Sequence, residues 1–261
     1  MAREYQYLLA EREGPTFTIT MNRPERRNSL CLELLEELTR AFDEAGASDA
    51  TGVILAGNGK VFSTGHDFAD MIGQDLQSVR LLFATCTNLM NTMQAIPQPV
   101  VARVHALATG AGCQLVATAD LAVASQEATF CTPGGKGGLF CTTPMVAVGR
   151  SIGRKRALEM AMSGDPIDAQ TALSWGLVNQ VVPAEELKAA TDALLERVTR
   201  GSALAKGIGK QAFYAQIGLD QPRAYDYATE VMASASQLPD AQEGIAAFLE
   251  KRPPKWSSGS N

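Results

Sequence analysis

Apolar residues follow two different spacings along the chain, and the change between them divides the sequence into two regions. Up to residue 182, short apolar runs typical of buried strands alternate with stretches in which apolar residues recur at helical spacing. From residue 183 onward only the helical spacing remains. Repeated strand–strand–helix units followed by helices predict an α/β core over residues 1–182 and a helical C-terminal region over residues 183–261.

The expected strands lie at 5–10, 16–21, 53–56, 99–104, 121–124, 128–132 and 177–182. The expected helices of the core lie at 30–45, 77–93, 113–119, 144–150, 154–162 and 168–175, and those of the C-terminal region at 184–199, 203–217, 222–236 and 240–251. Ser29 is a plausible N-cap of the first helix. The glycine-dense segment 133–138 predicts a loop.

Two glycine-containing turns join a predicted strand to a predicted helix, at Ser63-Thr64-Gly65-His66 and at Thr109-Gly110-Ala111-Gly112. Such a turn leaves free backbone N–H groups, which can bind a phosphate or the oxyanion of an activated carbonyl. A close-packed turn without a ligand has the same pattern. No Gly-Lys-Ser/Thr follows, and GAGCQL lacks the third glycine of a dinucleotide fingerprint. The turns alone therefore leave the ligand open.

Composition excludes several classes of function. A net charge of −5 without a basic stripe argues against a nucleic-acid partner, and no apolar run reaches the ~18 residues of a membrane helix. Two histidines, and five cysteines without CxxC spacing, indicate reduced thiols and no metal site. Residues 1–14 have neither the apolar centre of a signal peptide nor the Arg/Ser-rich composition of a transit peptide. We therefore expect a cytoplasmic protein.

The whole chain resembles the crotonase, or enoyl-CoA hydratase/isomerase, superfamily. The segments NRPERRNSL, GKVFSTGHDFADM, ALEMAMSGDPIDAQTALSWGLVNQVVP and EGIAAFLEKRPPKW occur in the family's order, together with residues 108–125. The GHD, GCQL, TPG and GLFCTTP runs look similar to the subgroup known as enoyl-CoA hydratase domain-containing protein 3. The resemblance implies a crotonase-like spiral of ββα units with a helical C-terminal trimerisation region. It also implies trimers, often paired into hexamers, and an acyl-CoA thioester ligand with no separate cofactor, since coenzyme A is part of the substrate.

The resemblance also assigns positions in the site. It places the peptide N–H groups of His66 and Ala111 at an oxyanion hole. Coenzyme A is expected at the Arg26-Arg27 loop and the Asp67-Phe68 segment, and at Lys251 where a neighbouring subunit approaches. The acyl pocket is expected at Leu139, Phe140 and Cys141.

One departure from the family changes the expected chemistry. Hydratases of the family use two glutamates, and the corresponding positions hold Gln114 and Gly134. A glutamine does not take a proton at neutral pH, and glycine has no side chain. A missing general acid or base lowers the rate by roughly 10²–10⁴-fold. Efficient hydration by the usual mechanism is therefore not expected. Enolate-type chemistry with another proton carrier, or an acyl-CoA sensor or partner subunit without activity, are the two alternatives.

Several side chains near these positions have two interpretations. His66 serves either as a replacement acid/base or only through its backbone N–H. Gln114 either orients a water or is a satisfied buried amide. Cys113 and Cys141 are either nucleophiles or small packing residues. Lys136 either contacts a coenzyme A phosphate or is an ordinary surface lysine. Asp67 is expected to cap the following helix, and Asp120 to be structural.

Overall fold

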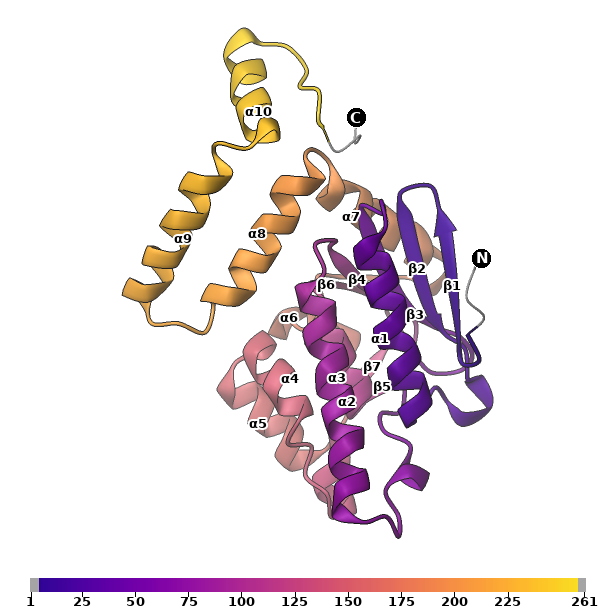
Figure 1. Cartoon of the computed structure of the whole chain (residues 1–261). Helices are drawn as coiled ribbons and strands as arrows, with labels where there is room; N and C mark the ends of the chain where they lie inside the picture. The colour runs from indigo at the N-terminus through magenta and orange to yellow at the C-terminus, as the bar shows by residue number, and fades with distance from the viewer. Residues whose placement is uncertain (1–4, 258–261) are drawn as a thin grey trace.

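A six-stranded sheet runs through the core, with the strand order β1-β2-β3-β4-β6-β9 (Figure 1). The structure is a computed structural model that describes residues 5–257. The strands are β1 Leu8–Glu13, β2 Thr16–Met21, β3 Gly52–Gly57, β4 Val100–Val104, β6 Leu121–Ser125 and β9 Gln180–Val182. β1 and β2 form an antiparallel hairpin, and every later neighbour in the order pairs in parallel.

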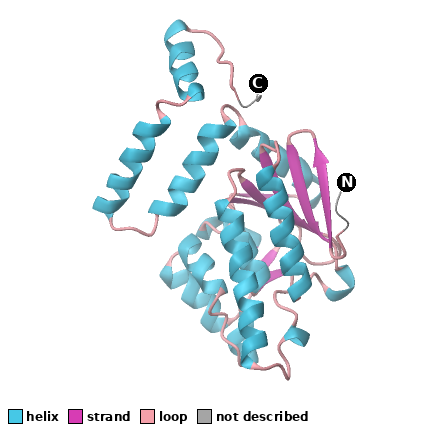
Figure 2. Ribbon diagram, viewed as in Figure 1, coloured by secondary structure: helices cyan, strands magenta, loops and turns pink. Residues whose placement is uncertain are grey.

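The parallel strands of this sheet are buried on both faces, which explains their nearly continuous apolar sequences. Along β3, Val53 and Leu55 join the main core, whereas Ile54 points to a second cluster on the opposite face. Helices α1 (Leu32–Ala47), α2 (Leu76–Ala95) and α3 (Ala111–Thr118) cover one face, and α7 (Leu187–Thr199) covers the other (Figure 2). The sheet therefore forms the middle layer of an α/β fold.

A second sheet of three short strands lies beside the first, in the order β5-β7-β8. It contains β5 Ala108–Thr109, β7 Thr129–Cys131 and β8 Ile167–Asp168. β5 and β8 have two residues each, too few to show a sequence period, and neither was predicted. β5 pairs in parallel with β7, so that Thr109 is opposite Cys131. This pairing fixes the second glycine turn, which follows β5 directly.

The remaining helices of the core are α4 Pro144–Ile152, α5 Arg154–Ser163 and α6 Ala169–Trp175, with 3₁₀ helices η1 Pro24–Arg26, η2 Phe68–Asp70, η3 Pro133–Gly137 and η4 Ala184–Glu186. Two predictions were wrong. The glycine-dense segment forms η3 instead of an irregular loop. Ser29 does not cap α1, because its hydroxyl donates to Asp67. An aspartate from η2 accepts the first N–H of the helix instead, from Leu32 to Asp70 Oδ2 at 2.9 Å.

The C-terminal region is helical as predicted, but its four helices differ in how they contact the core. α7 packs on the main sheet through Leu187, Leu194 and Leu195. α8 (Ala203–Gln216), α9 (Gln221–Ala235) and α10 (Pro239–Glu250) lie to one side, and α9 has no buried residue (Figure 1). The part that projects from the core therefore begins after α7.

A buried ion pair joins α8 to the core. Lys210 Nζ lies 2.8 Å from Asp120 Oδ2 and donates to the carbonyls of Met93 and Gln98, also at 2.8 Å. The Tyr214 hydroxyl donates to the other carboxylate oxygen of Asp120 at 2.8 Å. Asp120 is therefore a structural residue, as the sequence predicted.

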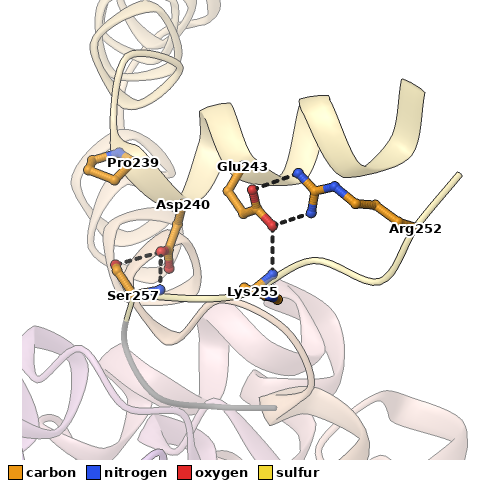
Figure 3. Close-up of a pocket in the computed structure, with 6 residues that line it drawn as sticks. All are labelled: Pro239, Asp240, Glu243, Arg252, Lys255 and Ser257. Carbon is orange, nitrogen blue, oxygen red and sulfur yellow. Dashed lines mark hydrogen bonds and ion pairs between the residues drawn. The ribbon is translucent and has the colours of Figure 1, made fainter. Parts of the chain in front are cut away.

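The segment after α10 folds back along that helix, and ion pairs hold it there (Figure 3). The Glu243 carboxylate accepts hydrogen bonds from both terminal nitrogens of Arg252, at 2.6 and 3.0 Å, and from the Lys255 N–H at 2.7 Å. These bonds hold the pKa of Glu243 at about 2. Asp240 receives the N–H and hydroxyl of Ser257. A hollow of about 370 Å³ beside these residues is thus lined by groups already paired with one another.

Candidate functional site

The two glycine turns meet in space, which the sequence alone did not establish. Ser63 and Ala108 form a parallel bridge, and the Thr109 N–H donates to the Ser63 carbonyl at 3.0 Å. Gly65 has φ = +79°, and a β-carbon there would lie 2.8 Å from the Thr109 oxygen and 2.9 Å from the Ala111 nitrogen. Only glycine permits this approach. Gly65 therefore brings the turn before His66 against the start of α3.

Two backbone N–H groups in the turns, those of His66 and Ala111, have no acceptor among residues 5–257. Leu30 bridges His66 by accepting from Asp67 N–H and donating to the Gly65 carbonyl, so the N–H of His66 itself points to the opposite side. Ala111 is the first residue of α3, where an N–H has no intrahelical acceptor. The dipole of α3 adds partial positive charge at the same end. This arrangement can stabilise an oxygen that carries negative charge.

A buried polar network holds the His66 turn. Asp67 accepts from Arg23 at 2.9 Å and from Ser29 at 3.1 Å, and caps η2 by accepting from Ala69 N–H at 3.2 Å. Burial opposes ionisation, but these bonds together with Arg26 lower the pKa of Asp67. Asp67 caps the following helix as predicted, and its carboxylate oxygens accept hydrogen bonds from groups of the protein itself.

Asn28 is the residue of this loop that sequence reasoning missed. It is fully buried with φ = +50°, and its Nδ2 donates to the carbonyls of Asn58 and Phe62 at 2.8 and 3.0 Å. Its Oδ1 accepts from Arg23 N–H at 2.9 Å. This role of Asn28 could not be predicted from the sequence, because it depends on which segment the loop packs against. The one available signal was that asparagine tolerates a positive φ.

Gly134 has no room for a side chain. A β-carbon there would run into the Leu139 carbonyl oxygen and lie 2.7 Å from Cys141 Sγ. The Leu139 N–H also donates to the Gly134 carbonyl at 2.9 Å, and the Gly134 N–H donates to Cys141 Sγ at 3.2 Å. The segment 134–141 has therefore closed over the space into which a glutamate at residue 134 would extend.

Gln114 lies one helical turn after Ala111, and its side chain is buried with 5% exposure. Its Oε1 has no hydrogen-bond partner within residues 5–257. The interpretation as a satisfied amide is therefore wrong for this oxygen. Thr132, which the sequence did not single out, is fully buried and has an unpaired Oγ1 in the same part of the chain. Buried polar atoms without partners are uncommon and call for an explanation.

The imidazole of His66 is buried and neutral at pH 7. Its edge packs on Phe83, with 5.0 Å between ring centroids and 87° between planes. Both ring nitrogens lack a hydrogen-bond partner in the described chain. Burial lowers the pKa of His66 to about 4, which a contact with the Leu30 backbone opposes only in part. These surroundings favour the interpretation in which His66 acts through its backbone.

The other predicted binding residues lie around the turns, with one exception. Arg26 and Arg27 are exposed on the loop before α1, and Arg26 reaches Asp67 at 3.5 Å. Phe68 is 72% exposed directly after the His66 turn. Lys251 is the C-cap residue of α10, which lies apart from α3 in Figure 1, so the structure does not bring it to the turns of its own chain.

The predicted acyl-pocket residues follow η3. Leu139 and Phe140 are 53% and 37% exposed, so their side chains are accessible to a ligand. Burial raises the pKa of Cys141, which keeps the thiol protonated at neutral pH. Burial also raises the pKa of Cys113, with Cys131 and Cys141 adding to the shift. The thiols of Cys113 and Cys141 are therefore not activated as nucleophiles.

Lys136 forms an ion pair with Asp165 at 2.5 Å on the surface.

Residues 5–257 contain neither a membrane-spanning helix nor a cluster of metal ligands. None of their helices has the length and apolar composition that a membrane crossing requires. Their His, Cys, Asp and Glu side chains form no group of three that could hold a metal ion.

Comparisons with known proteins agree with the geometry. A family model for enoyl-CoA hydratase/isomerase matches residues 11–259. The chain is 43% identical over 254 residues to the mitochondrial enoyl-CoA hydratase domain-containing protein 3 of Danio rerio, covering 96% of this chain and 87% of that protein. A solved structure of an enoyl-CoA hydratase from Mycobacterium smegmatis superposes with a TM-score of 0.93 at 42% identity, covering 96% of this chain and 99% of that one.

The human relative gives the same result and corrects one prediction. The solved structure of human enoyl coenzyme A hydratase domain-containing protein 3 has a TM-score of 0.92 at 40% identity, covering 96% of this chain and all of that one. The curated human sequence is 42% identical over 243 residues, which is 92% of this chain and 80% of that protein. Both curated relatives are named mitochondrial. The cytoplasmic location predicted from the N-terminal composition is contradicted by these names.

Proposed function

The chain belongs to the enoyl-CoA hydratase/isomerase family, and from this premise we propose that it binds an acyl-CoA thioester between its two glycine turns. The thioester carbonyl oxygen accepts the N–H groups of His66 and Ala111, and the acyl chain extends toward Leu139 and Phe140. The observation that carries this proposal is the contact of Gly65 with the start of α3. In the proposed complex both donors bond the same oxygen and stabilise the negative charge on it.

The reaction at this carbonyl lacks the usual proton carriers. Gln114 can donate and accept hydrogen bonds but does not exchange a proton at neutral pH. Gly134 offers neither a side chain nor space for one. His66, with its pKa at about 4, is a weak base in a buried position. Hydration of a 2-enoyl-CoA is therefore slow or absent, and the chemistry that remains is polarisation of the thioester.

A sensor or partner subunit without activity is the second candidate. The packing of the 134–141 segment supports it, because Leu139 and Cys141 leave no room for a carboxylate side chain at residue 134. Such a protein keeps the affinity for the thioester and loses turnover. Both candidates share one binding mode and differ only in the fate of the ligand.

Exposed apolar side chains on the projecting helices support self-association. They include Phe213, Ile217, Tyr225, Met232, Ile245, Phe248 and Leu249. Many large apolar side chains left exposed on neighbouring helices favour an interface between copies of the chain. A homotrimer, or a dimer of trimers, would cover these helices with a second copy and bring Lys251 toward the ligand of a neighbouring subunit. Light scattering coupled to size-exclusion chromatography measures the number of copies.

Calorimetry with butyryl-CoA and with free coenzyme A tests the binding proposal. Tighter binding of the ester than of coenzyme A is expected, since only the ester has a carbonyl for the two N–H donors. Equal affinity would contradict the oxyanion site. Incubation with crotonyl-CoA then separates the candidates: turnover that is lost in Gln114→Ala supports an enzyme, and binding without consumption supports a sensor.

A further inference from the structure

The chain reverses direction at the end of α10. Lys251 has a left-handed backbone with φ = +55°, and the Arg252 N–H donates to the Ala247 carbonyl at 3.0 Å. This pattern ends a helix and turns the chain away from its axis. Prolines at 253 and 254 then restrict the next residues to extended conformations. Residues 251–257 form a C-terminal strap that runs back along α10 (Figure 3).

The strap covers one face of α10. Asp240, Glu243 and Gly244 recur at intervals of three and four residues, which places them on the same side of the helix. Asp240 and Glu243 accept hydrogen bonds from the strap, and a β-carbon at Gly244 would lie 3.3 Å from the Trp256 ring. Glycine at residue 244 therefore lets the indole lie close to the helix.

A different face of α10 is open to solvent. Ile245, Phe248 and Leu249, again at helical spacing, are 52%, 82% and 73% exposed. Because the strap lies on the other side of the helix, its position determines which side of α10 faces solvent.

Two sets of bonds hold the strap, and the outer set consists of charged groups that solvent reaches. The Arg252 guanidinium lies 2.6 Å from Glu243 and 2.6 Å from Glu250, and these three side chains are 37%, 24% and 62% exposed respectively. Glu243 also accepts the Lys255 N–H at 2.7 Å. Ion pairs that are this exposed are weak, and salt screens them. The outer set is therefore the part of the strap that opens most easily.

The inner set is buried and centres on Asp240, which is 3% exposed. Its carboxylate accepts the Ser257 N–H at 2.7 Å, the Ser257 hydroxyl at 2.6 Å and the Ser202 hydroxyl at 2.5 Å. Ser202 is the N-cap residue of α8. One buried carboxylate thus joins the start of α8, the start of α10 and the end of the strap. Salt screens buried bonds much less than exposed ones.

We propose that the strap opens in two stages. The outer set around Arg252 opens first and responds to ionic strength, whereas Asp240 keeps α10 attached to α8 until the inner set is broken. The first stage frees residues 252–255 and leaves α10 in place. The second stage frees α10 together with the face that the strap covers. This inference concerns the projecting helices alone and does not depend on whether the glycine turns bind a thioester.

Amide hydrogen exchange of the full chain, followed residue by residue by NMR, tests the two stages. The Lys255 and Ser257 amides report the outer and the inner set separately, because each donates to one of the two carboxylates. In about 1 M NaCl the Lys255 amide should exchange about twofold to fivefold faster, the range for an exposed ion pair, and the Ser257 amide should keep its rate. Arg252→Gln should have the same effect at low salt.

Asp240→Ala removes the inner set. The Ser257 amide should then exchange like an unprotected amide, and the amides of α10 should exchange at least about tenfold faster than in the wild-type protein, while those of the main sheet keep their rates. Ser202→Ala removes only the bond to α8 and serves if Asp240→Ala does not fold. It should speed exchange in α10 and leave the Ser257 amide protected.

Arg200→Gln is the matched control for Arg252→Gln, since Arg200 pairs with Glu196 of α7 at 3.9 Å instead of with the strap. It should leave both reporter amides unchanged. Faster exchange of α10 in Arg252→Gln, or α10 amides that stay protected without the inner set, overturns the order of the two stages. Unprotected Lys255 and Ser257 amides in the wild-type protein overturn the strap itself.

Discussion

Gly65 and Gly134 both lie where a side chain would collide with neighbouring atoms, yet they affect the site in opposite ways. At Gly65 the missing side chain lets one turn approach the other, and two N–H donors become available. At Gly134 it lets the following segment close, and the carbonyl of Leu139 and the sulfur of Cys141 take the space. The absence of a side chain therefore brings two turns together at Gly65, whereas at Gly134 it lets neighbouring atoms fill the space of a side chain. On the proposed function, the first contact serves thioester binding, and the second leaves no room for a carboxylate at residue 134.

The largest effect is expected for Gly65→Ala. A methyl group would lie 2.8 Å from the Thr109 oxygen at φ = +79°, so the two turns must separate. We expect a loss of about 3 kcal/mol in the free energy of unfolding from the left-handed conformation and the overpacking together. Any thioester turnover should fall by ~10²–10³-fold, as for the loss of an oxyanion donor. Urea denaturation and butyryl-CoA titration measure both effects.

Gly73→Ala is the matched control for this change. Gly73 has φ = +72°, but a β-carbon there meets nothing within 4 Å. Only the conformational cost of about 1–2 kcal/mol should remain, with thioester binding intact. Equal losses in both variants would mean that the contact between the turns contributes nothing.

The pH dependence of stability tests whether His66 is held neutral. Its pKa of about 4 in the folded protein lies below the value of ~6.5 of an exposed histidine. The unfolded chain takes up a proton that the folded chain refuses, so stability falls as the pH drops below 6.5, and the loss is complete below about 4. Between pH 7 and pH 4.5 the free energy of unfolding of the wild-type protein should fall by about 2–3 kcal/mol more than that of His66→Gln.

His105 gives the background for that experiment. Its ring contacts the Gly59 carbonyl at 3.0 Å, and burial lowers its pKa as well. His105→Gln should change the pH dependence less than His66→Gln does. If His66→Gln leaves the pH profile of unfolding unchanged, the imidazole is not held neutral, and a role as acid or base becomes open again.

A glutamate at residue 134, where the resemblance implies one in hydratases, should not produce hydration. In Gly134→Glu the new side chain begins against the Leu139 oxygen and Cys141, so the segment must reopen. We expect a loss of about 1–3 kcal/mol, as for an overpacked site, and no gain in crotonyl-CoA hydration. Gly137→Glu adds the same charge to η3 at a position with nothing within 4 Å and should leave stability nearly unchanged. Faster hydration in Gly134→Glu would show that the closed segment opens readily.

The sequence predicted most of the fold, because the buried strands and amphipathic helices have clear apolar spacings. The sequence also located both glycine turns, but not their contact. The two turns are some 45 residues apart, and their contact depends on the pairing of β5, which is too short to recognise in the sequence. Gln114 could be singled out by its departure from the family. The unpaired hydroxyl of Thr132 could not be predicted, because whether a buried hydroxyl finds a partner depends on the packing around η3, which spacing does not encode.

The smallest effect is expected for Gln114→Glu, which returns the first glutamate alone. The new carboxyl would be buried, and burial raises the pKa of a carboxyl, so that a smaller fraction of it is ionised and able to act as a base. Residue 134 still has no carboxylate, and the lack of this general acid or base keeps the rate roughly 10²–10⁴-fold lower. We expect crotonyl-CoA hydration to rise by no more than about tenfold, measured as loss of the enoyl absorbance. Gln98→Glu, at another buried glutamine with an unpaired Oε1, should have no effect on hydration. A gain well above a hundredfold would mean that one carboxylate is sufficient, and that the closure around Gly134 is not what limits the chemistry.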